Sequence, residues 1–423
     1  MRFFIRLTCL VLVVWFSSVV SADDWPQFRG VNRDGKSAET GLMKQWPEDG
    51  PELLYTVQDL GTGWSSPSIV KGRMYTAGLI DKMGYVFAHD LNGNLIWKSP
   101  YGPEYQRSYP GSRSQPTYND GRLYTISGLG VIYCFDAESG AKIWQVDTFD
   151  KFGGRQTRWG IHEAPLVVEE KVICTPGGET ASMVALNKKT GDTIWITKGI
   201  SDLSAFCSPI LIERGGRRII VTQLEFALTG VDLETGEVLW RDLYAEYKIK
   251  TNPTFPVSPI YYDGGIYATC GFDAGGAMVQ LSPEGTQVAR KWIDTTLDTY
   301  FQQVVEVGGY IYGASYHETH TGGWVCLDFK TGKVIYQTDG SINKGGIMYA
   351  DDMLYCVDDR KGEVHLVPPL PQPNGFQPVS SFKIPQGSGT YWSIPVISDS
   401  RLYLRHGDVI MVYDIKEKKG TTN

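Results

Sequence analysis

One turn motif recurs along this chain about every 45 residues, and a repeat of that length constrains the fold more than any other feature. Each copy starts with Asp or Asn, has a Gly three or four positions later, and ends in an aromatic residue four positions after that Gly. The copies occupy residues 90–97, 136–144, 187–195, 232–240 and 328–336. The Asp or Asn side chain can hydrogen-bond the turn backbone, and Gly accepts the positive φ of a tight hairpin. Because apolar residues precede each turn and alternate after it, every copy predicts two half-buried antiparallel strands.

A second recurring pattern lies upstream of these turns and supplies two more strands per unit. It has Pro at its second position, an apolar stretch, a polar turn and a closing Tyr. The copies occupy residues 66–75, 115–124, 258–267 and 394–403. Pro is tolerated at the start of an innermost strand, where its missing N–H is not needed. Four strands in each repeat of this length predict a propeller blade.

The number of units predicts an all-β fold, a single closed eight-bladed β-propeller of four-stranded antiparallel blades. Residues 345–384 form a degenerate seventh blade, and residues 393–415 supply only three strands of the eighth. A strand at residues 53–57 completes the eighth blade, so both chain ends close the ring and remove exposed sheet edges. Seven blades is the alternative. We expect six outer-strand aromatic residues to dock onto neighbouring blades: Trp97, Trp144, Trp195, Trp240, Trp292 and Tyr336.

The start of the chain predicts export. Arg2 and Arg6 precede an apolar run over residues 7–16, and small residues end the segment at Ala22. This order is typical of a cleavable secretory signal; an uncleaved N-terminal anchor is the alternative. We therefore expect a periplasmic or extracellular protein. Its predicted parts are a signal peptide (1–22), an extension packing on the propeller (23–50) and the propeller itself (51–423).

Composition narrows the range of partners. The net charge is −7 and no basic stripe is present, so nucleic acid is not an expected partner. No other stretch reaches the length of a membrane helix, which predicts no membrane span in the mature protein. We expect a monomer with an unknown protein or polymer partner. The later cysteines lie singly in apolar runs, which predicts buried core residues, with disulfides as the alternative: Cys134, Cys174, Cys207, Cys270, Cys326 and Cys356.

The turn motif resembles the tryptophan-docking motif of the PQQ-like β-propeller repeat family, A-x-D-x-x-T-G-x-x-x-W. The resemblance covers nearly all of the chain after the signal, and residues 24–30 and 152–160 look like a secreted branch of the family. The family includes quinoprotein dehydrogenases and BamB-like scaffolds, so the resemblance implies one of these two kinds of function. The dehydrogenases carry an adjacent Cys pair and long insertions with Ca²⁺ ligands, and many add a CxxCH haem motif. This sequence has no adjacent Cys pair and no CxxCH, and it is too short for such insertions.

The loops that lead into the innermost strands of a propeller gather at one mouth of its channel, where ligand sites are common. Eight residues of these loops are the predicted ligand site: Trp64, Arg113, Trp159, His162, Glu163, Gln303, Lys344 and Trp392. Together they would form a polar, aromatic-walled pocket for an anionic or sugar-like molecule or a peptide. The alternative is that they satisfy backbone groups and stack the loops. A His162–Glu163 acid–base pair is disfavoured because adjacent residues of an extended segment point to opposite sides; we predict no catalytic residue.

Three other motifs suggest sites but favour structural roles. The pair His317 and His320 has a spacing of three in a loop, so we expect no metal site there. The proline-rich stretch 368–375 is expected to be a stiff connection within the seventh blade rather than a polyproline ligand. Residues 34–37 resemble a fragment of a phosphate loop but lack its first Gly and its strand–helix context.

These observations predict an exported, non-catalytic binding or scaffolding propeller that docks a partner protein or polymer through the mouth of its channel. No cofactor is expected for that function. The alternative is a PQQ-dependent oxidoreductase of sugars or alcohols, which would need PQQ with a carboxylate-bound Ca²⁺ beside the quinone.

Overall fold

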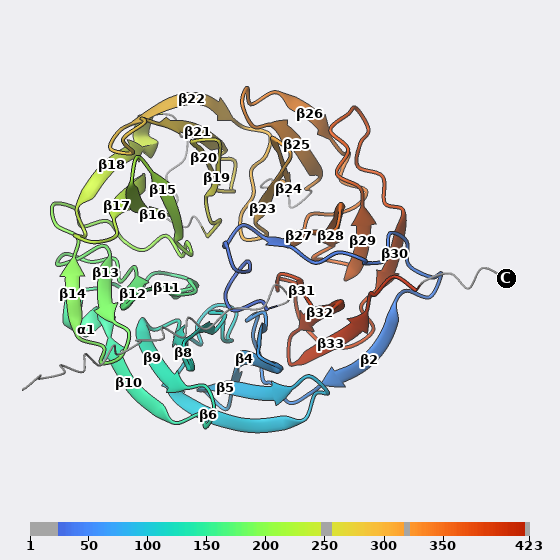
Figure 1. Cartoon of the computed structure of the whole chain (residues 1–423), viewed down its shortest axis with the longest axis horizontal. Helices are drawn as coiled ribbons and strands as arrows, with labels where there is room; N and C mark the ends of the chain where they lie inside the picture. The colour runs from blue at the N-terminus through green and yellow to red at the C-terminus, as the bar shows by residue number, and fades with distance from the viewer. Residues whose placement is uncertain (1–23, 247–255, 317–321, 419–423) are drawn as a thin grey trace, which may run out of the picture.

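The computed structural model describes residues 24–246, 256–316 and 322–418. Eight antiparallel sheets stand around a central axis, each with four strands of the repeat (Figure 1). The predicted eight-bladed β-propeller is therefore confirmed. The only helical elements among the described residues are α1 (Thr148–Phe152) and the short 3-10 helix η1 (Tyr244–Glu246). None of the described helices is long and apolar enough to cross a membrane.

The first four blades follow the chain from the channel outward. Blade 1 has β3 (Ser68–Val70), β4 (Arg73–Ile80), β5 (Met83–Asp90) and β6 (Leu95–Pro103). Blade 2 has β7 (Thr117–Asn119), β8 (Arg122–Ile126), β9 (Val131–Asp136) and β10 (Lys142–Asp147). Blade 3 has β11 (Leu166–Val168), β12 (Lys171–Cys174), β13 (Val184–Asn187) and β14 (Thr193–Ile196). Blade 4 has β15 (Ile210–Arg214), β16 (Arg217–Gln223), β17 (Ala227–Asp232) and β18 (Val238–Leu243).

The other four blades complete the ring. Blade 5 has β19 (Ile260–Tyr262), β20 (Gly265–Thr269), β21 (Gly276–Leu281) and β22 (Val288–Asp294). Blade 6 has β23 (Val304–Val307), β24 (Tyr310–Ala314), β25 (Trp324–Asp328) and β26 (Val334–Gln337). Blade 7 has β27 (Ile347–Ala350), β28 (Met353–Val357), β29 (Glu363–Val367) and β30 (Ser380–Lys383). Blade 8 has β31 (Val396–Ser398), β32 (Arg401–His406), β33 (Val409–Asp414) and β2 (Glu52–Val57).

The two ends of the chain meet in blade 8. Strand β2 pairs antiparallel with β33, with Leu53 opposite Tyr413 and Val57 opposite Ile410. The N-terminal strand thus covers the outer side of the C-terminal hairpin, as the sequence predicted. The proline-rich stretch 368–375 lies in the connection between β29 and β30 of blade 7.

The outer-strand tryptophans contact the turn of the next blade. The indole N–H groups of Trp97, Trp144, Trp195 and Trp292 donate to backbone carbonyls of the following blade at 3.0–3.2 Å. The turn glycine has a second role here, because a Cβ on Gly236 would lie 2.6 Å from the ring of Trp195. Trp240 and Tyr336 are also buried. Trp240 Nε1 has no partner within the described ranges.

The segment before β2 enters the centre of the ring. We call residues 24–37 the plug. Trp25 forms a bridge with Ile69 of β3, and the carbonyl of Pro26 accepts from Tyr118 N–H of β7. At its other end, β1 (Lys36–Ser37) pairs parallel with the innermost strand β27. In Figure 1 this dark blue segment crosses the middle of the propeller.

Two buried arginines anchor the plug to opposite parts of the ring. Arg29 donates to the carbonyl of Val304 at 2.7 Å, and Arg33 donates to the carbonyls of Ala164 and Pro165 at 2.7 and 3.2 Å. Burial lowers the pKa of both guanidinium groups to about 10. Both therefore stay charged near neutral pH, and the carbonyl bonds offset part of the cost of burying that charge. The channel is consequently filled by the chain's own N-terminal segment.

We predict that Trp195→Ala lowers the free energy of unfolding by about 3 kcal/mol or more, because it removes a buried indole between two blades. Trp195 is 8% exposed. Its neighbour Ile194 is 42% exposed on the same strand, so Ile194→Ala is the matched control. That change should stay within about 1 kcal/mol. Urea unfolding followed by circular dichroism measures both variants, and equal losses would contradict a docking role for Trp195.

Candidate functional site

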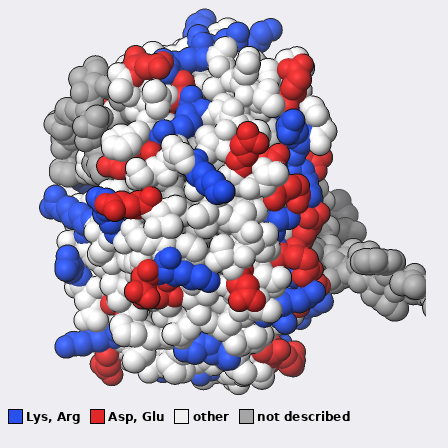
Figure 2. Space-filling view, turned by 90° about the vertical axis from the view of Figure 1, so that its left-hand side faces the viewer, with Lys and Arg blue, Asp and Glu red and all other residues white. Residues whose placement is uncertain are grey.

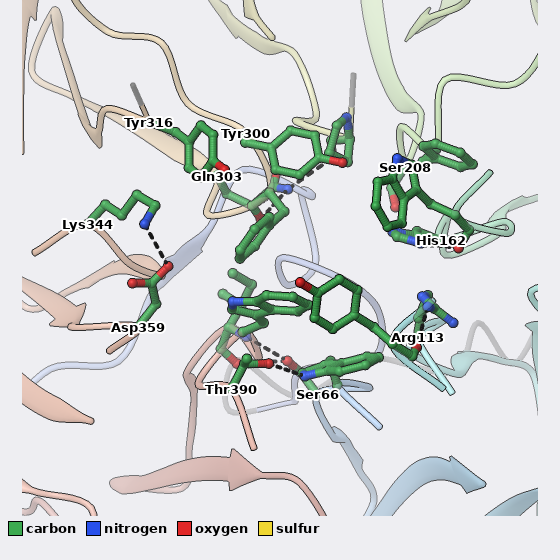
Figure 3. Close-up of a pocket in the computed structure, with 18 of the residues that line it drawn as sticks. Ser66, Arg113, His162, Ser208, Tyr300, Gln303, Tyr316, Lys344, Asp359 and Thr390 are labelled. Atoms are coloured by element: carbon green, nitrogen blue, oxygen red, sulfur yellow. Dashed lines mark hydrogen bonds and ion pairs between the residues drawn. The ribbon is translucent and has the colours of Figure 1, made fainter. Parts of the chain in front are cut away.

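A pocket of about 440 Å³ opens at one mouth of the channel (Figure 3). Phe28 of the plug is among its lining residues, so the plug closes the pocket toward the interior. The walls come from loops of all eight blades, and ten aromatic side chains dominate them: Phe28, Trp64, Tyr109, Trp159, Phe206, Phe272, Tyr300, Phe301, Tyr316 and Trp392. A volume of this size and an apolar wall with a few polar groups are typical of small-molecule sites.

Trp392 is the centre of the aromatic wall. Its ring centre lies 5.3 Å from that of Trp64 and 4.8 Å from those of Tyr109 and Phe301. Trp64 Nε1 donates to Thr390 Oγ1 at 2.9 Å, which fixes the plane of that indole. Aromatic pairs in such geometry contribute about 0.5–1.5 kcal/mol each beyond their burial. The wall is therefore held in place by its own contacts.

Four lining residues have a left-handed backbone. They are Tyr109 (φ 51°), Phe206 (φ 67°), Phe272 (φ 58°) and Gln303 (φ 70°). Elsewhere in the described ranges, the non-glycine residues with positive φ are Arg, Asp, Lys, Glu, Asn and Ser. A bulky aromatic residue in this region costs about 1–3 kcal/mol, and such strain concentrates at functional sites. The coincidence of all three strained aromatics with one pocket marks it as the candidate site.

Hydrogen bonds hold Gln303 in its strained conformation. Its Oε1 accepts from Ser258 N–H at 3.0 Å, and its Nε2 donates to the carbonyl of Pro256 at 3.1 Å. Arg29 of the plug also reaches this Oε1 at 3.5 Å. Gln303 therefore links the pocket wall to the plug below it.

Three of the lining residues carry a positive charge and one is a carboxylate. The cations are Arg113, Lys344 and Arg360, and the carboxylate is Asp359. Asp359 faces Lys344 Nζ at 3.4 Å and accepts from Asn343 Nδ2 at 2.6 Å and Gln302 Nε2 at 3.2 Å. Burial raises the pKa of Asp359, while Lys344 opposes that rise. With this carboxylate already engaged, the pocket keeps a positive excess.

Arg113 is fixed by backbone carbonyls. It donates to the carbonyls of Gly111, Ser108 and Tyr109 at 2.9, 3.0 and 2.6 Å. Its guanidinium carbon lies 5.2 Å from the ring centre of Trp64, a cation–π contact. Arg113 thus holds the loop that carries Tyr109 as well as lining the pocket.

His162 is held as a neutral ring. Its Nε2 lies 2.9 Å from the carbonyl of Trp159, and its ring stacks on Phe206 at 4.9 Å. Burial and the charge of Arg113 lower its pKa to about 3. Because a carbonyl can only accept, Nε2 carries the proton and Nδ1 keeps a lone pair.

Glu163 points away from the pocket and is fully buried. Its carboxylate accepts from Thr175 N–H at 2.8 Å and from Thr175 Oγ1 at 2.5 Å. Burial raises its pKa to about 7. The structure therefore places seven of the eight predicted site residues around the pocket and separates Glu163 from His162.

The sequence did not select Phe272, Tyr316, Asp359 or Arg360. These residues lie between the second and third strands of blades 5, 6 and 7. In a four-stranded antiparallel blade, this loop emerges at the same edge as the loop entering the innermost strand. Polar and aromatic residues in that second loop are the signal that could have located them.

Possible metal ligands outside the pocket already have other roles. Asp358, Glu363 and His365 of blade 7 place ligand-type atoms within 4.8 Å of one another. However, Asp358 accepts from the N–H groups of Asn343, Arg360 and Lys361. This carboxylate thus caps a turn of the repeat. Residues His317 and His320 lie outside the described ranges, as do residues 1–22 of the expected signal peptide.

Figure 2 shows one side of the propeller, with Lys and Arg scattered among Asp and Glu and wide uncharged areas between them. No continuous basic stripe crosses the described residues visible on this side. The charge distribution on this side therefore provides no continuous positive surface for binding a phosphate backbone.

We predict that the stability contributed by Glu163 is lost as the pH rises. Its pKa is raised from 4.5 to about 7 in the folded protein, so the folded state holds the proton more tightly than the unfolded state. The contribution is full below pH 4.5 and disappears as the pH rises through 7. It amounts to about 3 kcal/mol.

Glu163→Gln keeps the shape of the side chain and removes its titration. Urea unfolding at about pH 5 and about pH 8 should show the wild type losing about 2–3 kcal/mol more than the variant. His162 titrates equally in both proteins and cancels in the comparison. Identical pH dependences of the two proteins would show that Glu163 is not the responsible group.

The chain is similar to two kinds of protein. A family model described as "Outer membrane protein assembly factor BamB" matches residues 82–338, more than half of the chain. Quinoprotein alcohol dehydrogenase PedH of Pseudomonas putida is 30% identical over 154 residues, 34% of this chain and 24% of that protein. Outer membrane protein assembly factor BamB of Shewanella oneidensis is 23% identical over 269 residues, 59% of this chain and 65% of that protein. The chain spans about a quarter of the length of the curated dehydrogenases it matches.

Solved structures of both kinds share the architecture. BamB from Moraxella catarrhalis has a TM-score of 0.60 at 15% identity, covering 86% of this chain and 99% of that chain. Quinohemoprotein alcohol dehydrogenase from Comamonas testosteroni has a TM-score of 0.66 at 13% identity, covering 95% and 82%. At these identities the likeness concerns the fold alone.

Proposed function

Because the chain belongs to the PQQ-like propeller family whose model is described as "Outer membrane protein assembly factor BamB", we propose that it is an exported binding propeller. It docks a partner protein or polymer at one mouth of its channel, and the pocket centred on Trp392 receives part of that partner. Relatives include both an assembly factor and dehydrogenases, so the residues of the pocket must decide between binding and catalysis.

The observation that carries this proposal is the set of strained aromatic residues around the pocket. Tyr109 and Phe272 have a strained left-handed backbone and place partly exposed rings at one mouth. Phe206 has the same backbone conformation, is only 1% exposed and stacks on His162. Tyr109 is 51% exposed, so part of its ring is open to solvent. Rigid aromatic side chains offer contact area at low entropic cost and are typical anchors of binding surfaces.

The titratable groups of the pocket favour binding over acid–base catalysis. His162 is neutral with its Nε2 proton committed to a carbonyl, and Asp359 is engaged by Lys344. Glu163, whose pKa lies near 7, points away from the pocket toward Thr175. Lys344 and Asp359, which lie 3.4 Å apart among the described lining residues, form an ion pair whose carboxylate is already held by amide donors.

The lining residues do not fit a Ca²⁺-loaded quinone. Ca²⁺ takes six to eight oxygen ligands, which include carboxylates, carbonyls and waters. Asp359 is the single carboxylate among the described lining residues, and amide and ammonium donors already occupy it. The described lining residues therefore do not supply a ligand set for this metal beside a quinone.

We expect Trp392→Ala to weaken docking strongly while leaving the fold intact. The immobilised mature protein should retain components of an envelope extract from the producing cells that Trp392→Ala and Tyr109→Ala do not retain. Removing one stacking anchor should weaken binding at least about tenfold, the equivalent of about 1.4 kcal/mol. Ile194→Ala, on the outer rim of blade 3, is the control and should bind like the wild type. Equal retention by the wild type and Trp392→Ala would place the docking surface elsewhere.

A thermal titration with PQQ and Ca²⁺ tests the competing function. A ligand that binds the folded state stabilises it by about 2.7 kcal/mol at one hundred times its dissociation constant. We expect no saturable rise in the unfolding midpoint of the wild type. A rise that Trp392→Ala or Arg113→Ala removes, together with PQQ-dependent oxidation of a sugar or alcohol, would identify an enzyme instead.

A further inference from the structure

Building on the proposed function, we propose that the pocket binds acidic saccharides, in which a sugar ring carries a carboxylate next to hydroxyl groups. Three features of the pocket each require one part of such a ligand. They are a buried ammonium with unused donors, a neutral histidine with an unused acceptor, and a continuous wall of aromatic rings. The Lys344–Asp359 pair lies on one side of the pocket and His162 and Arg113 lie on the other (Figure 3).

Lys344 can bind a further acceptor in addition to its partner Asp359. Its side chain is only 5% exposed, and its Nζ carries three N–H donors. Among the described residues it has one ionic partner, Asp359 at 3.4 Å, and one cation–π contact with Tyr316 at 5.0 Å. A buried ammonium with unused donors is costly unless an acceptor arrives. A carboxylate in the pocket would supply that acceptor in an environment where Coulomb attraction is strong.

His162 requires a donor from the ligand. Its Nε2 proton goes to the carbonyl of Trp159, so Nδ1 can only accept. No described residue donates to this Nδ1. The ring stays neutral down to acidic pH, because its pKa is lowered to about 3. A hydroxyl group can donate to this Nδ1. A carboxylate at the same place would be repelled, because both groups are hydrogen-bond acceptors.

The aromatic wall requires a ligand with apolar faces. Trp64 and Tyr109 each pack on Trp392, with ring centres 5.3 and 4.8 Å from it. Phe301 continues the wall, because its ring centre lies 4.8 Å from that of Trp392 and 5.3 Å from that of Tyr300. Phe272, Tyr300 and Tyr316 form a second group with centres 4.4–5.8 Å apart. The C–H faces of a sugar ring can pack on such rings while its hydroxyls reach polar groups at the ring edge.

Other ligand classes satisfy only part of this arrangement. A neutral sugar leaves the unused donors of Lys344 without an anion. An aromatic carboxylate satisfies Lys344 and the aromatic wall, but it has no hydroxyl for His162 Nδ1. An acidic saccharide supplies the carboxylate, the hydroxyls and the apolar faces together.

Titration calorimetry with three probes tests the proposal: digalacturonate, the uncharged galactobiose, and naphthoate. Digalacturonate should bind the wild type at least about tenfold more tightly than galactobiose. Lys344→Met should remove this preference by weakening digalacturonate binding, whereas Lys344→Arg should keep it. Lys383→Met is the control, because Lys383 is exposed on the outer strand β30 of the same blade. Thermal unfolding of each variant establishes that it is folded.

His162→Phe tests the acceptor separately. It should weaken both saccharides and leave naphthoate unchanged, because only the saccharides donate to Nδ1. Equal binding of digalacturonate and galactobiose, or tighter binding of naphthoate, would overturn the acidic-saccharide proposal. Failure of both saccharides, while Trp392-dependent docking from the envelope extract persists, would also overturn it but leave the proposed function standing. Failure of both saccharides to bind, together with failure of Trp392-dependent docking, would overturn both the acidic-saccharide proposal and the proposed function.

Discussion

The bond between an outer-strand indole and a carbonyl of the next blade is the recurring contact of this ring, and it joins blades 1 to 2, 2 to 3, 3 to 4 and 5 to 6. A single four-stranded blade cannot bury both of its faces, so its stability must come from its neighbours. The indole of Trp195 makes two contacts across the interface between blades 3 and 4. It donates to the carbonyl of Leu233 at 3.0 Å and packs on Gly236. The repeat keeps Asp or Asn, Gly and an aromatic residue together because the turn of one blade is also the docking surface for the tryptophan of the blade before it.

The plug turns an open ring into a blind pocket. Residues 24–37 link the innermost strands of blades 1, 2 and 7, while Arg29 and Arg33 reach blades 6 and 3. Without this segment, the polar backbone edges of the innermost strands would face the channel. With it, Phe28 forms the floor and Arg29 supports Gln303 in the wall. The same short segment therefore stabilises the ring and defines the depth of the site.

The sequence predicted those parts of the site that follow the repeat. Trp64, Arg113 and Trp392 stand just before innermost strands, at positions that three of the four copies of the Pro-containing pattern mark. The plug could not be predicted, because residues 24–37 carry no repeat and their partners lie in blades far along the chain. Tyr316 and Asp359 were missed for a geometric reason, since their loops meet the others only after antiparallel folding. The sequence analysis included Glu163 in the site because it follows His162 in the same loop. In the extended backbone its side chain points to the opposite side, into the core beside Thr175.

The charge of the site contrasts with that of the whole chain. The protein has a net charge of −7, yet cations outnumber carboxylates among the residues that line the pocket. Long-range attraction therefore does not bring an anion to the molecule, because exposed charges are screened within about 8–10 Å at ordinary ionic strength. Discrimination must arise inside the pocket, where Lys344 is desolvated and its field is poorly screened. Such a site selects ligands by local contacts rather than by attracting anions from solution. This property distinguishes a specific binding site from a charged surface that binds anions non-specifically.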